Sequence, residues 1–173
     1  MADKKSKQSQ SKKTEPESTD PIEMLTKDHD KVKQLFREYE SAGDRAYDRK
    51  QGIADEVFTE LEIHSAIEEE IFYPALQDSG DEEGQKIVAE AIEEHRLVKQ
   101  LISELRGLDV QDQQFDAKFK VLTENVEHHA EEEESEMFPE VEDVLEDELD
   151  ELGARMKARK EELKTSGLGE AAA

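Results

Sequence analysis

From Pro21 onward, apolar side chains recur every three or four residues, and strand-like alternation of apolar and polar positions is rare. Such spacing is typical of amphipathic helices. Four apolar stripes are separated by short breaks that contain Gly43, Gly80 and Gly107. Because helices of about 20 to 30 residues with short connections favour antiparallel neighbours, the sequence predicts an all-α, up-down-up-down four-helix bundle.

Start and stop signals set the boundaries of these helices. Asp20 supplies a capping carboxylate, and Pro21 suits the first helical position. Ser79 and Gly80 form a second break, which Asp81 follows. The expected helices cover residues 21 to 41, about 44–48 to 73, and 82 to 106, and a fourth helix begins near Asp109 or Asp112 and runs to 139.

The ends of the chain differ from the bundle. Residues 1–19 hold no aromatic or large aliphatic side chain beyond Met1, which predicts a flexible tail. The bundle is assigned to residues 20–139. Residues 140–173 change from acidic to basic, which predicts an extra, more exposed helix followed by a small-residue tail.

The two halves of the predicted bundle repeat each other. HDKVKQLF, beginning at His29, matches HRLVKQLI, which begins at His95, 66 residues later. HSAIEEEIFYP, beginning at His64, matches HAEEEESEMFP, which begins at His129, 65 residues later. A duplicated helical hairpin would bring all four histidines to equivalent levels of the bundle.

Each half contributes a lone histidine and a His-x-x-x-Glu pair on the apolar stripes. Residues four apart share one helix face. An unpaired carboxylate on a buried stripe costs several kcal/mol, so its presence there indicates a partner or a metal. Imidazole with carboxylate suits iron, manganese or zinc, and carboxylates can span two ions. The expected metal ligands are His29, His64, Glu68, His95, His129 and Glu133.

Other residues near these motifs have weaker claims. A single histidine on an apolar stripe is more often a hydrogen-bonded core residue than a ligand, but four, one per helix, favour a site. Position 128 lies about 100° around the helix from 129, so His129 is expected to face inward and His128 outward. Additional candidates beside the ligands are Glu69, Lys99 and Glu134, whereas a solvated acidic face is expected for Glu70, Glu131 and Glu132.

Charge and composition narrow the function classes. The 47 Asp and Glu residues outnumber the 23 Lys and Arg residues, giving a net charge of −24. This field disfavours nucleic acid and anionic membranes as partners. With no cysteine, disulfides and thiolate sites are excluded. No signal-peptide core or membrane-spanning apolar run is present, so a cytoplasmic location is expected.

The motif set resembles the haemerythrin-like family, also known as the HHE cation-binding domain. Its pattern is a lone His, then His-x-x-x-Glu followed by an aromatic and Pro, and the same again. The resemblance implies a four-helix bundle with a non-haem di-iron centre (Fe2+/Fe3+, oxo- or hydroxo-bridged, with Mn or Zn possible), bridged by the two Glu and capped by the His. It also implies a small ligand such as dioxygen, nitric oxide or peroxide, in sensing or stress defence.

Two departures from the oxygen-carrying members bear on function. Lys99 stands where those members have a second histidine, four residues after His95. Glu133 stands at the fourth place after His129, where they have Asp at the fifth. Fewer nitrogen ligands argue against reversible oxygen carriage. A peroxide-decomposing enzyme, an iron storage or buffering protein, and a metal-free acidic bundle are the alternatives, and any protein partner is left open.

Overall fold

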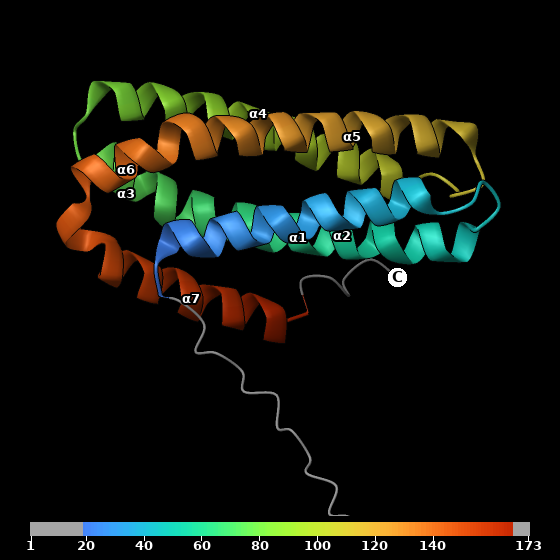
Figure 1. The fold of residues 1–173 in the computed structure, drawn as a ribbon, viewed down its shortest axis with the longest axis horizontal. Helices are drawn as coiled ribbons and strands as arrows, with labels where there is room; N and C mark the ends of the chain where they lie inside the picture. The colour runs from blue at the N-terminus through green and yellow to red at the C-terminus, as the bar shows by residue number, and fades with distance from the viewer. Residues whose placement is uncertain (1–18, 168–173) are drawn as a thin grey trace, which may run out of the picture.

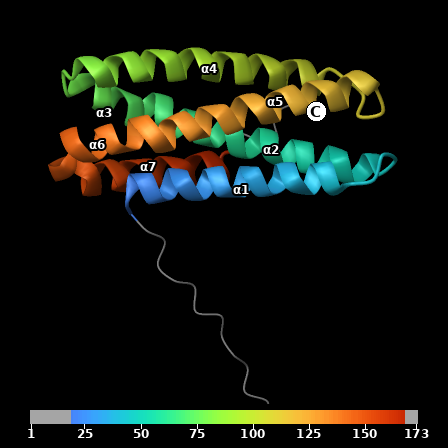
Figure 2. The ribbon, with the colours of Figure 1, turned by 45° about the horizontal axis from the view of Figure 1, so that its top comes forward.

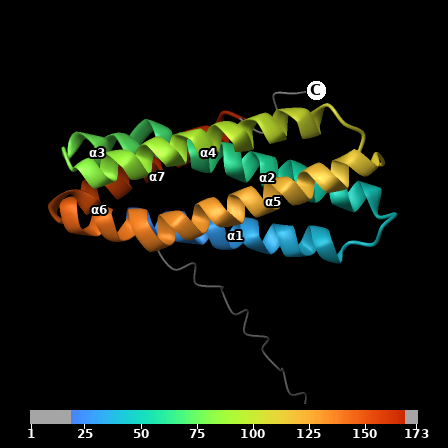
Figure 3. The same ribbon diagram turned by 90° about the horizontal axis from the view of Figure 1, so that it is seen from above.

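The computed structural model describes residues 19–167, and Figure 1 shows an up-down-up-down bundle of two helical hairpins with one further helix packed beside it. Helix α1 lies beside α5, and α2 lies beside α4, as the view from above shows (Figure 3). The elements are α1 (Pro21–Ser41), α2 (Tyr47–Ile67), η1 (Glu68–Phe72), α3 (Tyr73–Asp78), α4 (Glu82–Arg106), α5 (Gln113–Glu132), η2 (Glu133–Met137), α6 (Phe138–Val144), η3 (Glu146–Glu148) and α7 (Leu149–Thr165). The predicted all-α bundle is confirmed.

Aspartate caps start three of the four long helices. Asp20 accepts hydrogen bonds from the backbone N–H groups of Ile22 and Glu23, at 2.8 and 3.2 Å. Asp81 and Asp112 do the same for α4 and α5. Each carboxylate satisfies donors that the first helical turn leaves open. The sequence signals located the starts of α1 and α4, and of the two starts considered for the fourth long helix the structure has Asp112.

The second and fourth long helices do not end at their prolines, contrary to the sequence-based expectation. Each passes through a five-residue π-helical turn, η1 or η2, and continues as α3 or α6. Proline removes one backbone donor and crowds the preceding turn, and a wider turn just before Pro74 and Pro139 accommodates it. The assigned bundle end at residue 139 therefore falls inside a continuous helix that runs to Val144.

The core is divided by a polar layer. One apolar cluster fills the end of the bundle near the α1–α2 and α4–α5 connections and contains Phe36, Phe58 and Phe119. The other fills the opposite end and contains Phe72 and Met137. Between them lie buried polar side chains, namely His29, His64, Glu68, His95, His129 and Glu133.

Helix α7 is less exposed than the sequence suggested. It lies along α1 and α2 and buries Leu152, Met156 and Leu163 (Figure 2). A side chain at Gly153 would overlap the backbone of Thr19, so glycine allows the close approach of α7 to the start of α1. The expected tails at residues 1–18 and 168–173 lie outside the described residues. Within residues 19–167, no helix is long and apolar enough to cross a membrane.

Candidate metal centre

The polar layer brings together all six residues that the sequence singled out as ligands. Each is at most 5% exposed. The four histidines come from α1, α2, α4 and α5, and each turns its Nε2 atom toward the Nε2 atom of the histidine on the other helix of its hairpin. Glu68 and Glu133 are the first residues of the two π-helical turns, so the turns position the carboxylates at the level of the histidines.

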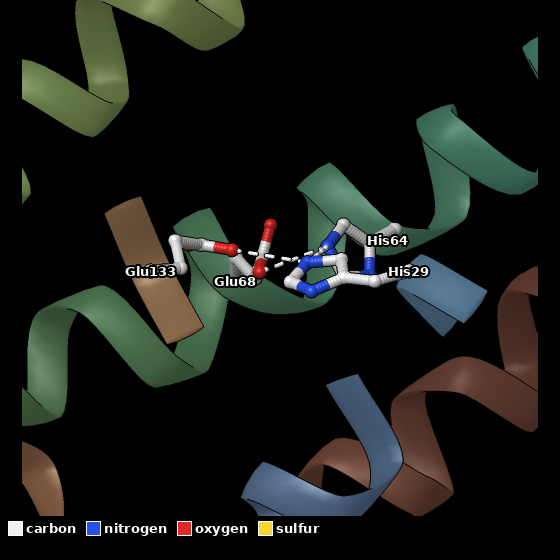
Figure 4. Close-up of side chains that lie close together, drawn as sticks. All are labelled: His29, His64, Glu68 and Glu133. Atoms are coloured by element: carbon white, nitrogen blue, oxygen red, sulfur yellow. Dashed lines mark hydrogen bonds and ion pairs between the residues drawn. The ribbon is translucent and has the colours of Figure 1, made fainter. Parts of the chain in front are cut away.

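The first cluster joins the two helices of the first hairpin to Glu133 (Figure 4). The Nε2 atoms of His29 and His64 lie 3.1 Å apart. Oε1 of Glu68 lies 3.0 Å from Nε2 of His64, and Oε2 of Glu133 lies 3.2 Å from Nε2 of His29. Two imidazoles and two carboxylates from three segments therefore converge on one point.

The second cluster is built in the same way from the second hairpin. The Nε2 atoms of His95 and His129 lie 3.0 Å apart. Oε2 of Glu68 lies 3.3 Å from Nε2 of His95, and Oε2 of Glu133 lies 3.6 Å from Nε2 of His129. The two oxygens of Glu68 thus face different clusters, which is the arrangement of a carboxylate that spans two ions.

The buried carboxylates are not satisfied by protein donors. Both oxygens of Glu68 and Oε2 of Glu133 accept no hydrogen bond among the described residues. Burial opposes ionisation of Glu68, but the neighbouring His64 and His95 hold its pKa well below the usual range. Burial likewise opposes protonation of His95, and Glu68 and Glu69 still raise its pKa to about 9. Anionic oxygens without donors fit a bound cation.

An outer carboxylate orients each imidazole from behind. The distance from Nδ1 to the nearest carboxylate oxygen is 2.7 or 2.8 Å for three of the histidines and 3.4 Å for His64. A ring that donates from Nδ1 keeps the lone pair of Nε2 free for a metal. The pairs are His29 with Glu134, His64 with Asp28, His95 with Glu69, and His129 with Glu94.

Comparison with known proteins agrees with this geometry. The Hemerythrin HHE cation binding domain matches residues 20–141. The chain belongs to this family. The uncharacterised protein Rv2633c of Mycobacterium tuberculosis (strain H37Rv) is 32% identical over 148 residues, which is 84% of this chain and 88% of that protein. An uncharacterised hemerythrin-like protein of Schizosaccharomyces pombe is 29% identical, over 72% of this chain and 60% of that one.

A solved structure shares the fold as well. The crystal structure of a Hemerythrin HHE cation binding domain-containing protein, the Rv2633c homolog from Mycobacterium kansasii, superposes with a TM-score of 0.73 at 32% identity. The match covers 86% of this chain and 90% of that chain. It thus extends beyond residues 20–141, the part that the family pattern describes.

The additional candidates of this haemerythrin-like domain lie outside the two clusters. Glu69 and Glu134 stand behind His95 and His29 instead of among the inward-facing Nε2 atoms. Lys99 donates to both oxygens of Glu69 at 2.6 Å and is half-exposed. It therefore points away from the centre and leaves the position of the carriers' extra histidine without an imidazole.

Sequence reasoning missed the part played by three residues. Asp28 and Glu94 each precede a lone histidine, and the structure places them behind the histidine of the neighbouring helix. Tyr73 donates to Oε1 of Glu133 at 2.7 Å, and its hydroxyl lies 3.2 Å from Nε2 of His95. The signal for Tyr73 was present, because the 65-residue repeat aligns it with Phe138, so the hydroxyl breaks the internal symmetry.

The two adjacent histidines of α5 face different sides of the helix, as their spacing indicates. His129 is buried in the centre, whereas His128 is exposed and pairs with Glu132 at 3.2 Å. The predicted helix register is therefore correct.

A small apolar hollow of about 20 Å³, partly open to solvent, is lined by the four histidines. Aliphatic side chains from all four long helices line it together with the histidines. These are Val32, Leu61, Val98 and Val126. The lining suits a small ligand with little charge.

Proposed function

We propose that the two clusters hold two iron ions and that the centre reacts with a small ligand such as dioxygen, nitric oxide or peroxide. The observation that carries this proposal is the set of buried carboxylate oxygens without hydrogen-bond donors, facing four inward Nε2 atoms. Family membership supports cation binding at this place. The donor atoms fall into two groups that share Glu68, and this division suits two ions better than one.

The residues of the chain would have the following roles. His29 and His64 serve one ion, His95 and His129 serve the other, and Glu68 spans both. Bound iron would supply the redox capacity and would polarise an oxygen-containing ligand. The outer carboxylates keep each imidazole in the tautomer that binds metal. Tyr73 holds a proton within hydrogen-bond distance of Glu133 and His95, where it could serve a bound ligand.

The surroundings favour a reactive centre over a reversible oxygen carrier. Lys99 turns to Glu69, so the second cluster gains no further imidazole from α4. With fewer nitrogen ligands, positions stay open for an incoming small ligand. We therefore expect azide or nitric oxide to perturb the optical spectrum, and we expect the reduced protein to oxidise in air without forming a long-lived adduct.

The test is metal analysis of freshly purified full-length protein, with optical spectra recorded in air and under reducing conditions. We expect close to two iron ions per chain and a near-ultraviolet band from an oxo-bridged ferric pair. A reproducible ratio of one, or of none, would contradict the proposal. Loading well beyond two ions would indicate storage instead, and an oxygen adduct that releases its gas on degassing would indicate carriage.

Turnover of hydrogen peroxide distinguishes peroxide from nitric oxide as the ligand with which the centre reacts. Dioxygen evolution from added hydrogen peroxide at a rate proportional to bound iron would assign peroxide decomposition. A stable nitrosyl spectrum with no peroxide turnover would assign sensing or scavenging of nitric oxide.

A further inference from the structure

The two halves of the bundle present different surfaces behind their ligands. In the first half, Asp28 lies behind His64, and Lys160 of α7 donates to its other oxygen. Both side chains of this ion pair are nearly buried, at 11% and 12% exposure. Helix α7 thus covers the approach to the centre on this side and places a positive charge across it.

The corresponding side of the second half is open and acidic. A small hollow of about 30 Å³ between α4 and the α5–η2 segment is partly open to solvent. Its outer lining is rich in carboxylates, namely Glu90, Glu94, Glu132 and Glu136. Its buried lining includes His129 and Glu133, so the hollow leads from the surface to the proposed ligands.

The carboxylate of Glu133 lines the buried part of this hollow and could bind a cation. Glu133 is 1% exposed, and its Oε2 atom accepts no hydrogen bond from the described residues. This unpartnered negative charge, together with the acidic outer lining, would attract a cation into the hollow.

At the mouth, three side chains can offer donor atoms together. One ligand atom each from Glu94, His128 and Glu132 lies within 4.8 Å of the other two. Because His128 is exposed and Glu94 and Glu132 are only partly covered, an ion held by them would remain exchangeable.

We propose that the hollow is the route by which a divalent cation reaches the centre, with Glu94, His128 and Glu132 as its first, transient binding site. The inference rests on the proposed function. The ligand is a hydrated divalent cation of the Fe2+ type, which oxygen and imidazole donors suit. The site acts on the rate of metal uptake. His128 and Glu132 contribute little to the final affinity, which depends on the buried ligands and on the carboxylates behind them, including Glu94.

The experiment measures how fast the metal-free full chain takes up Co2+, followed by its visible absorption in stopped flow without oxygen. Two variants alter the route and spare the proposed ligands and their outer carboxylates: His128→Gln with Glu132→Gln, and Glu136→Lys. Loss of local steering should slow uptake at least about tenfold, most in Glu136→Lys, while the final ratio stays at two ions per chain.

Matched controls separate a local route from overall charge. Glu124→Gln and Glu124→Lys make comparable charge changes on the same helix, at a side chain that is 63% exposed and outside the hollow. These controls should load within about twofold of the wild-type rate, because exposed charges beyond a Debye length of about 10 Å are largely screened at 0.1 M salt.

Three results would overturn the route. They are unchanged uptake in both hollow variants, equal slowing by the Glu124 controls, and a final ratio below two in the His128 and Glu132 variant. Each of these leaves the proposed function intact if the wild-type protein binds two ions. A wild-type protein that takes up no metal would instead overturn the proposed function and the route with it.

Discussion

The first and second hairpins carry the same inner ligands but different surroundings. The inner histidines and glutamates match at offsets of 65 or 66 residues, and so do the outer carboxylates, the π-helical turns and the prolines after them. The outer lysines match too, since Lys33 contacts Glu134 behind His29, as Lys99 contacts Glu69 behind His95. Each hairpin supplies half of one centre, and neither could assemble it alone.

The differences fall just outside the ligands. Tyr73 in the first hairpin corresponds to Phe138 in the second, which stacks on His29 with ring centroids 5.9 Å apart. Lys160 neutralises Asp28 on the first side, whereas Glu94 on the second side faces Glu132. Duplication thus accounts for the repeated histidines and glutamates, and divergence of their neighbours makes the two clusters unequal.

Removing the shared carboxylate should have the largest effect, because Glu68 is the residue whose two oxygens face both clusters. We expect Glu68→Ala to lose most of both metals. The variant should therefore lack about 3 kcal/mol of metal-linked stability, the gain expected for the loaded wild-type protein at a metal concentration about 100 times the dissociation constant. Metal analysis and thermal unfolding with and without metal check this. Full metal content in the variant would show that Glu68 does not join the two positions.

The matching test within one helix compares His129→Ala with His128→Ala. Since His129 belongs to the second cluster and His128 is exposed, the first variant should bind about half the metal or less, and the second should keep full content at equilibrium. Metal analysis and the optical spectrum report both. A loss of metal in His128→Ala alone would show that the buried histidine is not the ligand.

The sequence predicted relations within one helix better than contacts between distant helices. Helical periodicity and spacing of four placed His64 with Glu68, and His129 with Glu133, on the inner face, because those relations are local to one helix. Lys160 contacts Asp28 across 132 residues, so no local pattern indicates it. The π-helical turns were missed because proline normally signals the end of a helix, and the wider turn that accommodates it has no simple pattern.

Removing one outer carboxylate at a time should affect the two positions separately. Asp28→Asn removes the carboxylate that orients His64, and Glu94→Gln removes the one that orients His129. Each variant should therefore bind one of the two metal ions about 10- to 100-fold more weakly. Stepwise Co2+ titration followed by absorption resolves the two events. Lys160→Met should repeat the effect of Asp28→Asn in weaker form and leave the other step unchanged. Equal weakening of both steps by any of these variants would contradict the assignment of one cluster to each hairpin.

Making the two hairpins alike at the aromatic position should have a smaller effect. Tyr73→Phe removes the donor to Oε1 of Glu133, so the metal-free protein should lose about 1 to 3 kcal/mol of stability, the usual cost of a buried acceptor left unpaired. Urea unfolding of the metal-free protein measures this. Phe138→Ala is the reciprocal control for lost packing against His29. A Tyr73→Phe variant as stable as the wild type would mean that water replaces the hydroxyl.

The smallest effect is expected at the outer lysines. Lys33 and Lys99 each pair with a glutamate that already accepts from an imidazole, and both pairs are partly open to solvent. Exposed ion pairs contribute about 0 to 1 kcal/mol, so Lys33→Ala and Lys99→Ala should each change metal affinity by less than about fivefold.

Lys99→His tests whether α4 can offer the carriers' extra imidazole. Because the side chain at this position extends toward Glu69, the new ring should bind Glu69 and leave the autoxidation rate unchanged. A slower autoxidation in Lys99→His, with no change in Lys99→Ala, would show that the ring can turn inward and that the second cluster has room for a further nitrogen ligand.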